Sequence, residues 1–194
     1  MRELELFLAT ALSTMTPILV TAIGGAFAEK SRTTNIGMEG MMLISAFFSM
    51  VIGFQAQSAW IGLLGGIACS LLVSFLFALM IFYLGCDKII GGIGLNLFAS
   101  GLTLLLMTVW FNEPGTYKPK GMPTLPVVDI PFLENIPVIG PALNGQSVLF
   151  FITIVLVFVL RYVMEKTKYG SWVRAVGELS LIHISEPTRL DVIS

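Results

Sequence analysis

The sequence predicts an all-α fold: a polytopic transmembrane helical bundle with about five spans in this fragment and a proline-rich external loop between spans four and five. The 194 residues are 56% hydrophobic and 12% charged, with a mean hydropathy of +0.89, whereas soluble domains are about 25% charged. The apolar residues also fall into long runs, and a helix needs about 20 of them to cross a bilayer core. We therefore expect a lipid bilayer around the chain. The sequence has no cluster of basic residues of the kind that binds nucleic acid.

Five apolar runs are the predicted spans, and they cover residues 6–28, 36–54, 60–84, 89–111 and 147–162. Short polar turns separate the first four. Trp60 and Trp110 lie at span ends, where an interfacial aromatic belt is expected. Pro17 lies inside the first run, which a membrane helix tolerates because neighbouring groups can satisfy the freed carbonyl.

Residues 112–146 form the predicted loop between spans four and five. They hold seven of the nine prolines, a density that no regular helix survives. Scattered apolar pairs such as Val127 and Val128 argue against simple disorder. We expect an ordered external cap, with room for a short re-entrant or surface helix.

The basic residues predict the orientation, because they concentrate on the cytoplasmic side of membrane proteins. An odd number of spans places seven on one side and three on the other. The first side is therefore predicted to be cytoplasmic, with the N-terminus and the proline-rich loop outside and residues 163–178 inside. The seven are Lys30, Arg32, Lys88, Arg161, Lys166, Lys168 and Arg174, and the three are Arg2, Lys118 and Lys120.

Residues 179–194 look foreign to the rest of the chain. The run from Leu179 to Arg189 resembles the translation of an adapter used to build sequencing libraries, and the alternative is a genuine amphipathic tail. We expect an incomplete transmembrane domain at residues 1–178 and a non-native, adapter-derived tail at 179–194. The tail is not expected to contribute to the fold. The single histidine, His183, lies in this tail, so residues 1–178 contain no histidine for acid–base, nucleophilic or metal chemistry.

A carboxylate near the start of the second predicted span is the first candidate for function. Glu39 is costly in a membrane and by default suggests a substrate pathway. Gly37 and Gly40 beside it allow close helix packing. Two structural alternatives stay open: an interfacial carboxylate stabilised by the helix dipole, or an ion pair with Arg32 or Lys88.

Asn96, about two turns into the fourth span, is the second candidate. Its amide needs partners, which are either another helix or a substrate hydroxyl, and we favour the helix. Gly92 precedes it by one turn and is assigned to helix packing. Gly62 and Gly66 give the third span a small face at a spacing of four, which also predicts packing.

The segment after the fifth span combines positive charges with apolar side chains. A short helix here could seat its apolar residues in a groove on a partner, with Arg174 making a polar contact. A purely positive-inside loop would leave the apolar residues unexplained. The candidates are Tyr169, Gly170, Trp172, Arg174, Gly177 and Glu178.

Three stretches together resemble a known family. These are Ala26–Ser31 with Asn35–Leu43, then Asn96-Leu97 followed by Gly101-Leu102-Thr103, and the run from Thr167 to Glu178. They are similar to permease subunits of ATP-binding-cassette importers for nucleosides and simple sugars. The family continues with Asn-Pro where this chain has Leu179, and its full members are longer.

The resemblance implies a role in the bacterial inner membrane and a set of partners. These are an ATPase subunit, a second permease subunit and an extracytoplasmic substrate-binding protein, and the segment around Arg174 would be the cytoplasmic element that docks on the ATPase. The chain has no P-loop motif. We therefore expect no enzyme activity, no metal and no cofactor of its own, with ATP used by the partner.

Two other classes stay open at this stage. An ion-coupled secondary transporter would also fit Glu39 and the glycine-interrupted fourth span. A structural membrane protein would use Glu39 and Asn96 only for packing. The sequence does not name the substrate, although the Asn35–Leu43 block is closer to nucleoside permeases.

Overall fold

A computed structural model describes residues 2–113, 115, 117, 121–128, 140 and 143–185, with only the backbone for residues 2 and 179–185. The long helices in this part are α1 (Arg2–Lys30), α2 (Met38–Ala56), α3 (Ala59–Phe82), α4 (Lys88–Phe111), α6 (Val148–Lys166) and α7 (Lys168–Ser185). All but α7 are long and apolar enough to cross a membrane. The predicted all-α bundle with five spans is confirmed, and the chain is a multi-pass membrane protein.

Local sequence explains where several helices begin and end. The carboxylate of Asp87 caps α4, since its Oδ1 accepts hydrogen bonds from the backbone N–H groups of Ile89 and Ile90 at 2.9 and 3.0 Å. α2 and α4 end at Gln57 and Asn112, which adopt the left-handed conformation that closes many helices. Pro17 lies inside a continuous α1, as the sequence predicts.

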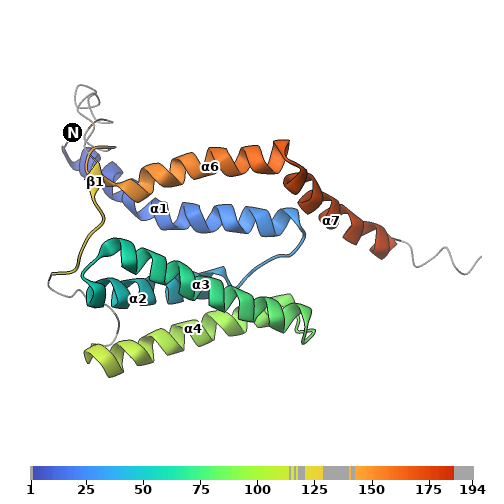
Figure 1. Ribbon diagram of the computed structural model, residues 1–194, viewed down its shortest axis with the longest axis horizontal. Coiled ribbons are helices and arrows are strands. Elements are labelled where there is room, and N and C mark those ends of the chain that lie inside the picture. The colour runs from blue at the N-terminus through green and yellow to red at the C-terminus, as the bar shows by residue number, and fades with distance from the viewer. Residues whose placement is uncertain are drawn as a thin grey trace, which may run out of the picture. The chain divides into compact units, whose positions relative to one another are not determined.

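The chain divides into two compact units, and the first consists of Met1–Thr34 and Val127–Ser194. Within it α1 and α6 lie side by side (Figure 1). Gln146, just before α6, donates from Nε2 to the carbonyl of Ala9 near the start of α1. Gly177, beyond the end of α6, lies against Lys30 at the end of α1. The two helices are therefore parallel, which agrees with three spans between them.

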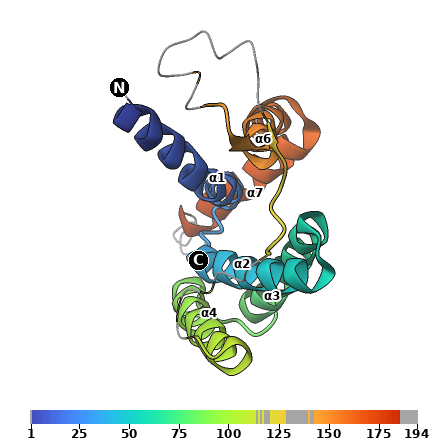
Figure 2. The ribbon, with the colours of Figure 1, turned by 90° about the vertical axis from the view of Figure 1, so that its left-hand side faces the viewer.

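The second unit, Asn35–Pro126, contains α2, α3 and α4 (Figure 2). α2 packs against both other helices. One buried cluster joins Met41 of α2 to Phe77 and Ile81 of α3, and another joins Phe47 and Val51 of α2 to Met107 of α4.

The outer faces of the spans are apolar and exposed. Leu71, Leu72 and Phe75 of α3 are each more than 60% exposed. In water such a surface would be a liability, whereas in a bilayer it faces hydrocarbon. The exposed leucines therefore agree with the lipid environment that the composition predicts.

Two short strands, one in the middle of the predicted loop and one at its end, form a ladder that the sequence did not predict. β1 (Val127–Val128) pairs antiparallel with β2 (Gln146–Ser147), with Val127 opposite Ser147. The ladder lies directly before α6. The short helix expected in this loop stays a prediction, because residues 129–139 lie outside the described residues.

α7 is longer than the short helix expected after the fifth span. It begins two residues after α6 ends and continues past Glu178 to Ser185. The first residues of the expected foreign tail thus continue the helix, and residues 186–194 lie outside the described part of the chain. The boundary at residue 178 stays a prediction.

Candidate functional site

The start of α2 is capped by a side chain from another helix. Gly37 occupies the N-cap position and offers no side chain for capping. Asn96 of α4 supplies the missing acceptor, because its Oδ1 accepts from the backbone N–H of Gly40 at 2.8 Å. The Nδ2 of Asn96 donates to the carbonyl of Ile36 at 3.0 Å. Both polar atoms of the amide are therefore engaged by the backbone around the α2 start.

Glycines make this contact sterically possible. A Cβ on Gly92 would come within 2.9 Å of the backbone nitrogen of Gly37. A Cβ on Gly40 would lie 3.0 Å from both Asn96 Oδ1 and the carbonyl oxygen of Leu95. The three glycines thus lie together with Asn96 in one junction between α2 and α4.

Glu39 lies in the first turn of α2, next to this junction. Its side chain is exposed, and Arg161–Glu165 is the one ion pair that the described residues form. The predicted alternative of an ion pair with Lys88 is therefore wrong for this structure. A carboxylate at a helix N-terminus is stabilised by the helix dipole, and the pathway role of Glu39 stays a prediction.

Gly62 and Gly66 lie where α3 crosses α2. A Cβ on Gly62 would come within 2.7 Å of Gly53 Cα and of the Ser49 carbonyl oxygen, and one on Gly66 would lie 2.8 Å from the Ser45 carbonyl oxygen. The Ser45 hydroxyl also donates to the Gly66 carbonyl at 3.1 Å. This face of α2 was not predicted, although its small residues Ser45, Ser49 and Gly53 recur at a spacing of four.

The segment after α6 folds back on the ends of two spans. Gly170 is buried so closely against the backbone of Met164 that no Cβ would fit. The guanidinium of Arg174 donates to the Met164 carbonyl and, at 3.4 Å, to the Ser171 hydroxyl. A Cβ on Gly177 would meet the carbonyl oxygen of Lys30 at 2.5 Å. Gly170, Arg174 and Gly177, three of the predicted coupling residues, therefore face the ends of α6 and α1.

The other predicted coupling residues face away from these helix ends. Tyr169 is 55% exposed and Trp172 67%, and Glu178 is exposed as well. Val176, which was not among the candidates, is 60% exposed. Positions 169, 172 and 176 share one face of a helix. We call these three side chains the outer face of α7, and Gly170, Arg174 and Gly177 its inner face.

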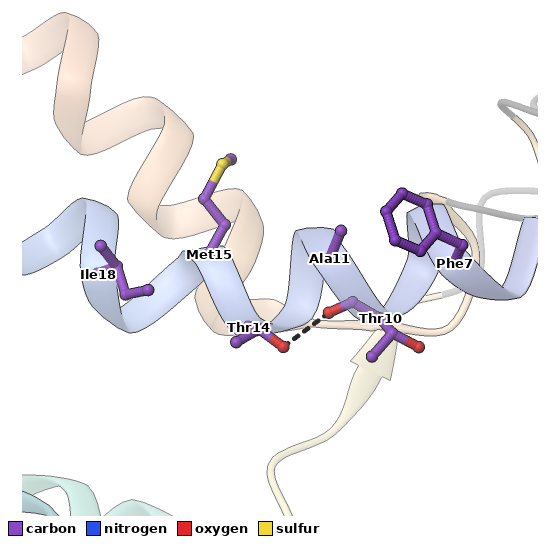
Figure 3. Close-up of a pocket in the computed structure, with 6 residues that line it drawn as sticks. All are labelled: Phe7, Thr10, Ala11, Thr14, Met15 and Ile18. Atoms are coloured by element: carbon purple, nitrogen blue, oxygen red, sulfur yellow. Dashed lines mark hydrogen bonds between the residues drawn. The ribbon is translucent and has the colours of Figure 1, made fainter.

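A hollow of about 390 Å³ lies along α1, between Phe7 and Ile18 (Figure 3). Its lining comes from this one helix. The hydroxyls of Thr10 and Thr14 donate to carbonyls one turn earlier in α1, at 2.8 Å each. The hollow is thus an open face of a span with no free polar group aimed into it. Within the described ranges, no cluster of three or more potential metal ligands occurs.

Comparison with known proteins identifies the family. The family described as "branched-chain amino acid transport system / permease component" matches residues 7–180. The chain belongs to this permease family. The match extends from the start of α1 into α7, so it includes both the Asn96 junction and the two faces of α7, and the family predicted from the three sequence stretches is confirmed.

Curated relatives carry names that specify a transport role. The chain is 35% identical to the nucleoside ABC transporter permease protein NupC of Lactococcus lactis subsp. cremoris, over 90% of this chain and 56% of that protein. It is 31% identical to the guanosine ABC transporter permease protein NupQ of Bacillus subtilis, over 84% and 52% of the two chains. A putative glucose ABC transporter permease protein of Haloferax volcanii is 28% identical, over 84% and 49%.

The chain spans about half the length of the curated relatives it matches. No solved structure matches it.

Proposed function

We propose that the chain is part of the permease subunit of an ATP-binding-cassette importer that moves nucleosides or simple sugars. The observation that carries this proposal is the family match over residues 7–180. Two relatives that are more than 30% identical are named as nucleoside or guanosine permeases, which supports nucleosides first. These names also favour the ATP-driven class over an ion-coupled secondary transporter.

The importer would need three partners: an ATPase, a second permease subunit and an extracytoplasmic substrate-binding protein. The distribution of basic residues supports an outside N-terminus and a cytoplasmic α7. In that orientation the proline-rich loop, which contains the β1–β2 ladder, would lie outside and face the binding protein.

The outer face of α7 supports the ATPase interaction. A cytoplasmic helix has no lipid to cover Tyr169, Trp172 and Val176, which are all more than half exposed. Aromatic side chains of this kind dominate protein interfaces, and a helix can present them to a groove on a partner. ATP-driven movement of that groove would pull on α7 and rock the spans between outward-open and inward-open states.

Reconstitution tests this function. The full-length permease is co-expressed with candidate ATPase and substrate-binding proteins from the same genome and placed in proteoliposomes. We expect uptake of a radiolabelled nucleoside that requires internal ATP and the binding protein. Uptake that follows a proton or sodium gradient without ATP would instead assign the chain to the secondary transporters, and the absence of any uptake of nucleosides or sugars would contradict a transport role for these substrates.

A further inference from the structure

The inner face of α7 rests on the carbonyl ends of two parallel spans. α6 leaves the helical conformation at Thr167, where ψ is 159°. Met164 lies in its last turn, where carbonyls have no further intrahelical donor. α1 ends at Lys30, and the carbonyl oxygen of Lys30 lies against Gly177 of α7. α7 therefore lies over both ends at once.

Arg174 supplies a hydrogen-bond donor to a carbonyl at the end of α6. Its guanidinium donates to the carbonyl of Met164, a residue that is itself buried. A cation at a helix C-terminus is also favoured by the negative end of the helix dipole. Because Arg174 is only partly exposed and its guanidinium points at α6, this geometry differs from the contact with a partner protein that the sequence suggested.

Gly170 and Gly177 let the helix come this close. Both are buried, and both lack space for a Cβ because backbone atoms of Met164 and Lys30 occupy it. Together with Arg174 they occupy positions i, i+4 and i+7 of one helix face. The inner face, which holds α7 against α6 and α1, is thus opposite to the exposed outer face.

We propose that Arg174 is a positioning residue, which fixes α7 to the ends of α6 and α1 so that a pull on the outer face moves both spans together. It does not itself bind the ATPase. This inference rests on the proposed function for the identity of the partner. The contact by which Arg174 holds α7 against α6 lies within the permease itself.

The first experiment measures how firmly α7 is held against α6 and α1, with no ATPase present. Most of the stability of a protein helix comes from the packing of one of its faces, so amide hydrogen exchange over residues 168–178 reports how well α7 is docked. In the full-length permease in lipid nanodiscs we expect Arg174→Gln to speed this exchange about tenfold, the effect of losing one hydrogen bond to a charged group. Lys168→Gln, at an exposed position of the same helix, is the matched control and should leave exchange unchanged. Equal exchange in the two variants would overturn the inference.

The second experiment separates positioning from ATPase binding. We expect the ATPase to co-purify with the Arg174→Gln permease as it does with the unmodified one, while nucleoside uptake per ATP hydrolysed falls about tenfold or more. Arg174→Lys should partly restore this ratio, since an ammonium can still donate to the Met164 carbonyl. Trp172→Ala, on the outer face, should lose co-purification.

Two results would overturn the positioning role: loss of the ATPase from Arg174→Gln to the same extent as from Trp172→Ala, or an unchanged ratio of uptake to hydrolysis. If the unmodified permease captures no ATPase, the proposed function fails. Hydrogen exchange then still decides whether Arg174 holds α7.

Discussion

Replacing Asn96 by alanine removes the two hydrogen bonds that join α4 to the start of α2. They connect Asn96 to the Gly40 N–H at 2.8 Å and to the Ile36 carbonyl at 3.0 Å. Interhelical hydrogen bonds in membrane proteins contribute about 0.6 kcal/mol on average and about 1.7 at most. We therefore expect Asn96→Ala to lower the free energy of unfolding by about 1–2 kcal/mol.

The assay is unfolding of the purified permease in mixed micelles with a rising fraction of SDS, followed by circular dichroism. Thr108→Ala is the matched control on the same helix, because the Thr108 hydroxyl donates only within α4, to the Leu104 carbonyl at 2.9 Å. Its effect should stay within about 0.5 kcal/mol, as for other exposed positions. If Asn96→Ala unfolds like Thr108→Ala but abolishes uptake, Asn96 lines the substrate pathway and the packing role is refuted.

Three further predictions concern packing, orientation and the end of the chain. Gly62→Ala should cost about 1–3 kcal/mol because its Cβ would meet the backbone of α2, whereas Gly101→Ala, which meets nothing within 4 Å, should be neutral or stabilising in the same SDS titration. In intact cells that express the permease with its cysteines replaced, an impermeant maleimide should label Gln55→Cys in the last turn of α2 and not Tyr83→Cys at the end of α3; the reverse pattern would invert the proposed orientation. Sequencing of the source locus should show a different continuation after residue 178, and a genome that encodes residues 179–194 would disprove the adapter origin.

The α6–α7 region shows why some site residues could be chosen from the sequence while their roles could not. The composition of the segment after the fifth span already pointed to Arg174 and Trp172. Their opposite directions depend on where α6 ends and on how α7 turns at Thr167. The sequence suggested a partner contact for both, and the structure separates them onto two faces.

Span number and span limits followed from the sequence alone, because the length of an apolar run is a local property set by bilayer thickness. The glycines at positions 37, 40, 62, 66 and 92 could likewise be assigned to packing from their spacing. The partners of these residues were decided only by the tertiary structure. The Asn96 amide meets backbone groups 56 and 60 residues away, and Gln146 reaches one 137 residues away. Such contacts depend on the register of one helix against another, which the spacing of residues within either helix does not contain.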